Sequence, residues 1–264
     1  MNVKTAGRTL DLFEAFARAG KPLSLSQLAR AIGAPVSSCF GIVRTLEARG
    51  YLYEVKARAG FYPTKLLFEQ ARAIASRDPL AERFVPLLEK LRDQTGETVL
   101  LSKRLDRQAV YLVVLDSLHS IRYSPKIGEF RPLHASASGK ALLGSLAPAL
   151  RGALLAGMKL PRVTSRTITS RAALEADLEQ ARARGWYLTR GETVADLMAV
   201  AVPVELNGET YSVALAGPMH RMEGALKRHA KLLLELGAAM EGRAGPAKGR
   251  DFDAARARGD KAAQ

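Results

Sequence analysis

The sequence predicts an α+β protein in which three helices and a hairpin precede a larger unit with a mainly antiparallel sheet. Up to Gly50, apolar residues recur at helical spacing. From Thr98 onward, β-branched and apolar runs alternate with turn residues, which is typical of strands. The 264 residues have the length of one large domain or two modest ones.

The composition is strongly basic. The chain has 40 Lys and Arg against 26 Asp and Glu, a formal charge of +14, and residues 1–75 hold 11 basic and 5 acidic side chains. A basic surface attracts polyanions, of which nucleic acid is the commonest. The single cysteine excludes an internal disulfide, and the four histidines lack metal-ligand spacing, so we expect no metal and no cofactor. The start of the chain lacks a secretory signal and no apolar run reaches about 18 residues, so we expect a cytoplasmic protein with no membrane partner.

The N-terminal part predicts three helices. The first ends before Gly20, and a Ser-x-x-Gln capping box at Ser24 opens a short second helix. After the turn at residues 33–35, a third helix begins near Val36 and ends at Gly50, a residue suited to the left-handed position after a helix.

A β-hairpin is predicted next. Two aromatic-rich strands at residues 51–55 and 61–63 flank a basic loop that contains a glycine. Helix, capped helix, turn, helix and basic hairpin are the order of a winged helix-turn-helix, which we place at residues 1–65. Residues 66–79 are predicted to form a helical linker.

The third helix is predicted to have two different sides. Its apolar side carries Cys39, Ile42, Val43 and Leu46. The opposite side is small and polar, which suits close approach to the major groove of DNA. A solvated helix in a small bundle is the alternative. We interpret Cys39 as a small core residue, with a redox switch as the other interpretation.

The candidate DNA contacts lie in the second and third helices and in the hairpin loop. Ser37 and Ser38, at the start of the third helix, are suited to phosphate. Arg44 is suited to a guanine edge or a phosphate, and Phe40 to a thymine methyl. We expect the loop residues to touch the DNA backbone or the minor groove. The full set is Ser26, Ser37, Ser38, Phe40, Gly41, Arg44, Lys56 and Arg58.

The pattern of residues 80–240 predicts the larger unit of helices and antiparallel strands. The expected strands are 98–103, 108–115, 121–124, 186–189, and 200–206 paired with 210–216 across Asn207-Gly208, a strong hairpin signal. The expected helices end near Leu146, Gly185 and Met240. Residues 241–264 consist largely of Gly, Ala, Arg and Asp, have almost no large apolar side chains, and are expected to be disordered. The sequence shows no phosphate-binding loop and no nucleophile elbow, so we expect no enzyme.

Short motifs throughout the chain resemble one family. They are Leu-Ser-Leu-Ser-Gln-Leu-Ala at 23–29, Arg-Thr-Leu-Glu-Ala-Arg-Gly-Tyr-Leu at 44–52, Thr-Gly-Glu-Thr-Val at 95–99, Pro-Leu-His-Ala-Ser and Gly-Lys-Ala-Leu-Leu within 128–143, Arg-Thr-Ile-Thr at 166–169, Arg-Gly-Trp at 184–186 and Ala-Gly-Pro at 216–218. In this order and spacing, residues 5–240 resemble the IclR-type transcriptional regulators. The resemblance implies a winged helix-turn-helix, a GAF-like effector domain, and dimers or tetramers that bind promoter DNA. Val36 and Gly41 stand where the family usually has a basic residue and an arginine, so the base-reading set must differ.

The resemblance also implies where an effector binds. Relatives have an acid, a cysteine and serines where this chain has Thr189 and three alanines, so we expect a larger and less polar pocket that suits an aromatic or longer apolar acid. Backbone N–H groups near residues 136–139 are expected to hold a carboxylate, with a plain helix cap as the alternative. The implied effector-binding residues are Ser136, Ala137, Ser138, Gly139, Thr189, Leu197, Ala199, Ala214 and Ala216.

We therefore predict a ligand-responsive regulator, a homodimer or homotetramer, that binds double-stranded promoter DNA and controls catabolic or transport genes in response to a small organic acid. Arg122, Arg131 and Arg190 are further candidate partners for a carboxylate, and we interpret His134 as structural. The alternatives are an enzyme with an accessory basic DNA- or RNA-binding domain, and an RNA-binding module, although the aromatic stacking motif of the latter is missing from the sequence.

Overall fold

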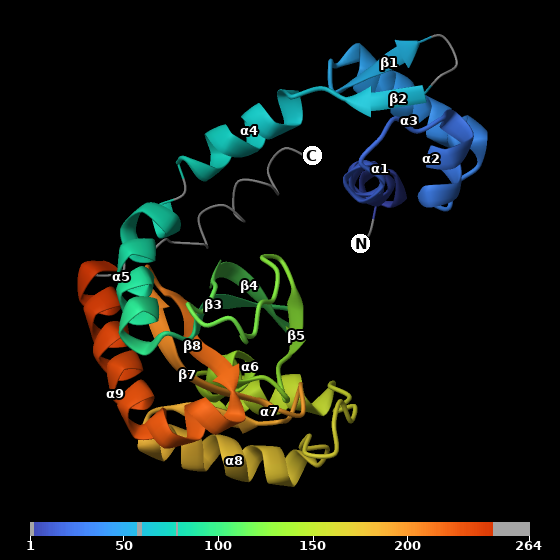
Figure 1. Ribbon diagram of the computed structural model, residues 1–264. Coiled ribbons are helices and arrows are strands. Elements are labelled where there is room, and N and C mark those ends of the chain that lie inside the picture. The colour runs from blue at the N-terminus through green and yellow to red at the C-terminus, as the bar shows by residue number, and fades with distance from the viewer. Residues whose placement is uncertain (1–2, 57–59, 78, 245–264) are drawn as a thin grey trace, which may run out of the picture. The chain divides into compact units, whose positions relative to one another are not determined.

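The computed structural model describes residues 3–56, 60–77 and 79–244, in two compact units, Met1–Pro79 and Leu80–Gln264 (Figure 1). The elements of the first unit are α1 (Lys4–Ala19), α2 (Leu25–Ala31), α3 (Val36–Ala48), β1 (Leu52–Lys56), β2 (Gly60–Pro63) and α4 (Leu66–Ala75). The predicted helix-turn-helix with a hairpin is confirmed.

Local signals in the sequence set the boundaries of these helices. The Ser24 hydroxyl accepts the backbone N–H of Gln27, and the Gln27 side chain accepts the backbone N–H of Ser24 at 2.8 Å, so the capping box is complete. Pro35 precedes α3, and Gly50 after it has φ +77°. The helices pack on one another through an apolar core that includes Leu12, Phe16, Leu28, Cys39 and Val43.

The hairpin is joined to the helices at one close contact. Leu23, just before α2, exchanges backbone hydrogen bonds with Phe61 of β2 at 3.1 and 2.9 Å. The neighbouring Gly60 has φ +120°, and a Cβ there would lie 2.8 Å from the Leu23 carbonyl oxygen. Only glycine satisfies both the backbone angle and the close approach.

The second unit is a six-stranded antiparallel sheet in the order β5-β4-β3-β8-β7-β6, covered by helices on both faces (Figure 1). Its strands are β3 (Thr98–Leu105), β4 (Gln108–Leu115), β5 (Phe130–Pro132), β6 (Tyr187–Arg190), β7 (Leu197–Leu206) and β8 (Glu209–Pro218). One face carries α5 (Pro79–Thr95) and α9 (Met219–Ala244), and the other carries α6 (Ala137–Gly144), α7 (Pro148–Ala156) and α8 (Arg171–Arg184). The predicted α+β fold class is confirmed.

Strand alternation divides the core between these faces. On β3, Val99 and Leu101 pack with α5 and α9, whereas Leu100 between them packs with α6 and α8. Every central strand is therefore apolar on both sides. This explains why these strands are continuous apolar runs in the sequence, without strict alternation of apolar and polar residues.

Three details differ from the sequence predictions. The strand expected at 121–124 is wrong, because residues 116–129 contain no helix or strand and β5 pairs with β4 instead. At residues 121–124 a side-chain hydrogen bond takes the place of strand pairing, since the Thr98 hydroxyl donates to the Tyr123 carbonyl at 2.5 Å. The helix α7, which begins with Pro148, was not expected. The helix α9 continues to Ala244, so residues 241–244 are helical, and the rest of the segment expected to be disordered lies outside the described residues.

A buried ion cluster joins three segments of the second unit. Lys140 of α6 is fully buried, and its Nζ lies 2.7 Å from Glu192 Oε1 and 2.8 Å from Asp177 Oδ2. Glu192 belongs to the segment between β6 and β7, and Asp177 belongs to α8. Burial raises the pKa of Glu192, although the Lys140 ammonium opposes that shift.

We expect Lys140→Ala to destabilise the second unit by about 3–5 kcal/mol, because it leaves two carboxylates without their shared cation. Trp186, the single tryptophan, lies just before β6 and reports on this unit alone in a urea titration. Lys227→Ala, at an exposed position on α9, is the matched control. Equal unfolding midpoints for the two variants would show that the cluster contributes nothing.

Candidate functional site

The helix α3 has an apolar buried side and a polar exposed side, as its helical spacing predicts. Cys39, Ile42, Val43 and Leu46 are buried. Ser37, Ser38, Phe40, Gly41 and Arg44 are all exposed. Burial raises the pKa of the Cys39 thiol, so this cysteine is an unreactive core residue.

Arg44 lies over the exposed side of α3. Its Nη1 is 2.7 Å from Glu47 Oε2, and its guanidinium lies 5.6 Å from the centre of the Phe40 ring. The arginine side chain is 60% exposed, and ion pairs at such exposure contribute little to stability. Arg44 is therefore free to exchange Glu47 for another anion.

The other candidate DNA contacts fall in different places. Ser38 and Gly41 line an open groove of about 840 Å³ between α3 and α1, together with Arg8. Ser26 is exposed on α2, with its hydroxyl 3.3 Å from that of Ser24. Lys56 ends β1, and Arg58 lies outside the described residues.

The candidate effector residues meet around a small cavity in the second unit. Ser136 caps the start of α6: its hydroxyl accepts the Gly139 N–H at 3.1 Å and donates to the Pro132 carbonyl at 2.8 Å. Gly139 does not line the cavity. It packs against the Leu133 backbone, which would lie 2.5 Å from a Cβ at this position. Glycine is needed at this position for packing. The cavity is lined by Leu100, Tyr111, Tyr123, Ser136, Ala137, Ser138, Thr189, Thr193, Leu197, Ala199, Ala214 and Ala216.

The expectation of a large pocket is wrong for this structure. The inner cavity, as we call this space, has a volume of about 10 Å³, which is room for about one water molecule. The small side chains of the strands do leave space, but two tyrosines, Tyr111 of β4 and Tyr123 of segment 116–129, line it as well. Neither tyrosine was predicted from the sequence. Tyr111 is two residues after Ala109 on the same side of a strand, a spacing that indicates a shared face.

The two tyrosines meet an arginine beside the inner cavity. Arg131 of β5 donates to the Tyr123 hydroxyl from Nε at 3.0 Å and from Nη2 at 2.8 Å, and also pairs with Glu129 at 2.6 Å. Burial and the adjacent Tyr123 raise the pKa of Tyr111. Burial by itself lowers the pKa of Arg131, but Tyr123, Tyr111 and Glu129 more than offset this, and the net shift is upward. Arg131 is therefore a permanent cation that contacts the inner cavity through the two tyrosines in its wall and does not itself line it.

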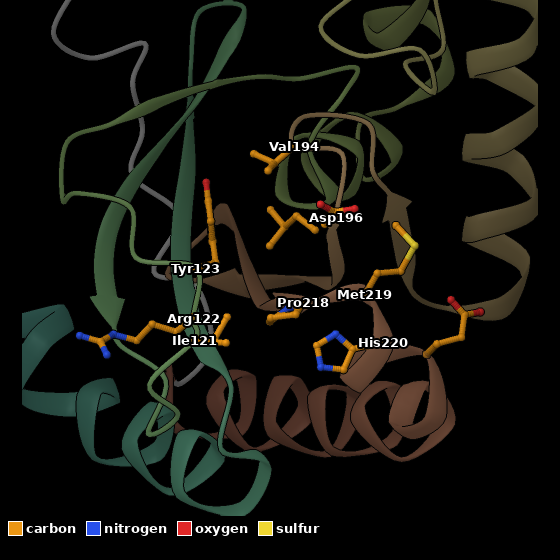
Figure 2. Close-up of a pocket in the computed structure, with 10 residues that line it drawn as sticks. Ile121, Arg122, Tyr123, Val194, Asp196, Pro218, Met219 and His220 are labelled. Atoms are coloured by element: carbon orange, nitrogen blue, oxygen red, sulfur yellow. The ribbon is translucent and has the colours of Figure 1, made fainter.

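An open pocket of about 740 Å³ lies next to the inner cavity and shares Tyr123 and Leu197 with it. Figure 2 shows the side chains around this outer pocket, with Tyr123 on segment 116–129 and Val194 and Asp196 on the segment before β7. Its lining is Ile121, Arg122, Tyr123, Val194, Asp196, Leu197, Pro218, Met219, His220 and Glu223. Most of these side chains present apolar atoms.

The remaining charged candidates do not face the inner cavity. Arg122 lies 3.8 Å from Asp116, and Arg190 pairs with Glu223 at 3.1 Å. His134 is buried, with Nε2 3.0 Å from the Pro161 carbonyl oxygen, and burial lowers its pKa, so it is a neutral structural histidine. Within the described ranges, no group of three or more His, Cys, Asp or Glu side chains is placed to bind a metal ion. The helices in the described part of the chain are also too short or too polar to span a bilayer.

Two family models match this chain. The IclR helix-turn-helix domain matches residues 5–56, and the bacterial transcriptional regulator IclR C-terminal domain matches residues 72–240. The chain is 32% identical over 225 residues to the HTH-type transcriptional regulator BhcR of Paracoccus denitrificans, covering 84% of this chain and 80% of that protein. It is 27% identical over 219 residues to the HTH-type transcriptional repressor AllR of Escherichia coli K12, covering 81% and 80%.

Solved structures share the fold. The Thermotoga maritima IclR superposes with a TM-score of 0.75 at 23% identity, covering 91% of this chain and 98% of that one. An IclR homolog complexed with 4-hydroxybenzoate, from Microbacterium hydrocarbonoxydans, superposes with a TM-score of 0.73 at 23% identity, covering 90% and 98%.

These relatives are regulators of transcription. The predicted function is confirmed at this level, and the alternative of an enzyme with an accessory binding domain is not supported. Because the C-terminal model alone spans more than half of the sequence, and the N-terminal model accounts for most of the rest, the chain belongs to the IclR family of bacterial transcriptional regulators.

Proposed function

We propose that this regulator binds double-stranded promoter DNA as a homodimer through α3 and changes its DNA affinity when a small apolar or aromatic carboxylic acid binds in the second unit. The observation that carries this proposal is the two-sided α3, with an aliphatic side in the core and a small, polar, exposed side. Genes for the uptake or breakdown of such an acid are the expected targets, and the cytoplasm is the expected place of action.

The start of α3 fits a phosphate group. No side chain caps this helix, so the first N–H groups around Ser37 and Ser38 are left for an external acceptor at the positive end of the helix dipole. Arg44 lies two turns further along the same exposed side and is suited to a guanine edge or a second phosphate. The small Gly41 between them lets the helix backbone approach the floor of the groove.

The exposed side of α4 supports a dimer. None of its residues is buried, and Phe68 and Ile74 are 63% and 73% exposed. Together with Leu67, Ala71 and Ala75 they form an apolar stripe on one side of the helix. An isolated helix of this length is marginal in water, so a second copy of the same stripe is the simplest partner.

The inner cavity supports the effector class. The N–H groups at the start of α6 lie beside a space lined by alanine and leucine side chains and by hydroxyl groups, and the Arg131 cation donates to the hydroxyl of Tyr123 in its wall. These features suit an acid with an apolar body. A protein of the same fold holds 4-hydroxybenzoate, an acid of this kind.

We expect Arg44→Ala to weaken binding to a duplex selected from a random library by about 5- to 150-fold if the arginine reads a base. If it contacts a phosphate instead, the log–log salt slope should fall by about 0.9. Arg18→Ala on α1 is the matched control, since Arg18 also forms an exposed pair within its helix, with Glu14. Titration by fluorescence anisotropy, with an RNA competitor of the same sequence, measures both quantities. If the Arg44→Ala chain binds the duplex as tightly as the Arg18→Ala chain, the exposed side of α3 is not the DNA-binding surface.

We expect Phe68→Glu to shift the chain toward monomers and to weaken operator binding, because it places a charge in the proposed dimer interface. Gln70→Glu adds the same charge to the same helix outside the apolar stripe and should leave the dimer intact. Light scattering after size-exclusion chromatography gives the mass. A Phe68→Glu chain that keeps the mass of the Gln70→Glu chain would exclude α4 as the interface.

We expect calorimetry to show binding of 4-hydroxybenzoate, benzoate or hexanoate in preference to pyruvate, because the outer pocket is mostly apolar and alanine and leucine side chains line part of the inner cavity. Ala199→Leu, which fills the inner cavity, should abolish this binding while operator binding remains. If none of these acids binds the wild-type chain, the effector class is wrong, while the DNA-binding proposal stands.

A further inference from the structure

The inner cavity and the outer pocket are separated by two side chains. Tyr123 and Leu197 line both spaces. The other side chains around the inner cavity are almost all buried, with Ala137, Ser138 and Ala216 at 1–2% exposure. A ligand therefore reaches the inner cavity only if a residue of its wall moves, and the side facing the outer pocket has the most room.

Tyr123 is better placed to move than Leu197. Leu197 begins β7 and is paired in the sheet with Pro218. Tyr123 lies in segment 116–129, which has no helix or strand. Its backbone is held by the Thr98 hydroxyl at 2.5 Å, whereas its phenol is held by two hydrogen bonds from Arg131 and a contact with the Tyr111 hydroxyl. The phenol is able to rotate away while the backbone anchor remains.

A carboxylate would accept the two Arg131 hydrogen bonds that hold the Tyr123 phenol more strongly than the phenol does. Arg131 directs two N–H donors, Nε and Nη2, to a single neutral phenol oxygen. A carboxylate offers two charged oxygens to the same pair of donors, and such bidentate pairs are shorter and stronger. The Tyr123 phenol thus occupies the donors of Arg131 in the way that an aromatic acid would.

We propose that Tyr123 is a gate between the outer pocket and the inner cavity, and that the outer pocket forms part of the effector site. A carboxylic acid enters through the outer pocket, displaces the Tyr123 phenol and accepts the hydrogen bonds of Arg131. Its apolar or aromatic body then extends from the inner cavity along Ile121, Val194 and Met219. This inference rests on the proposed function, and it specifies an acid too large for the inner cavity alone.

Cysteine labelling tests the gate without knowledge of the effector. Ala199→Cys places a thiol in the inner cavity, and the fully buried Cys39 gives a background rate that is measured in the chain without this change. In the Ala199→Cys chain, we expect the further change Tyr123→Ala to raise the rate at which a small anionic methanethiosulfonate reagent labels the new thiol at least 10-fold. Adding Val194→Trp, which narrows the outer pocket, should bring the rate back toward that of Ala199→Cys alone.

The control for this experiment is Ile127→Ala, an exposed position of the same segment that lines neither space. Equal rates in the Tyr123→Ala and Ile127→Ala chains would overturn the gate, because general loosening of the segment would then explain the labelling. If Val194→Trp leaves the rate unchanged, the outer pocket is not the entry route.

The exchange of Arg131 between phenol and carboxylate is tested with 4-hydroxybenzoate. Tyr123→Phe keeps the ring and removes the competing oxygen, so we expect about 3- to 10-fold tighter binding and faster association in stopped-flow measurements. Arg131→Gln should weaken binding at least 10-fold. Unchanged or weaker binding by Tyr123→Phe would overturn the exchange. If the wild-type chain binds no acid at all, the proposed effector fails and the exchange with it, while the labelling rates still decide whether Tyr123 closes the cavity.

Discussion

The shape of the candidate effector site depends on the ion pairs of Lys140. This lysine is one turn into α6, whose first residues form one wall of the inner cavity. Its partner Glu192 lies between Thr189 and Leu197, which form the opposite wall, and the segment is also held by the Thr167 hydroxyl, 2.7 Å from the Glu192 carbonyl oxygen. Removing one member of such a cluster leaves a buried charge without its partner, which is strongly unfavourable, so the three groups stay together. The two walls are therefore fixed relative to each other.

The sheet connects the inner cavity with the helix that follows the DNA-binding unit in the chain. Leu100 of β3 lines the inner cavity, and its neighbours Val99 and Leu101 pack against α5 on the other face. The chain continues from α4 directly into α5. A change at the inner cavity that moves β3 therefore also displaces α5, because the core between them is closely packed and has few voids.

The parts of the fold with local signals were predicted well from the sequence. The capping box at Ser24, the Gly50 and Gly185 helix ends and the Asn207-Gly208 hairpin are each determined by a few neighbouring residues. The structure of segment 116–129 was not predicted, because its β-like residues are held by side-chain hydrogen bonds to distant positions such as Thr98. The lining of the inner cavity followed largely from motif position, but its volume did not. That volume depends on where the long Tyr111 and Tyr123 side chains lie, which sequence spacing does not determine.

The tyrosines also explain how a wall of small residues coexists with an almost closed cavity. Ala137, Ala199, Ala214 and Ala216 leave space that an aromatic ring is needed to fill, and an empty apolar space of that size would cost stability. Tyr111 and Tyr123 supply these rings from within the chain. An aromatic ligand that displaces Tyr123 therefore gains only the difference between its own contacts and those of the phenol. The measured affinity of such a ligand is then lower than its contacts alone would give, because only the molecules in which Tyr123 has moved away can bind it.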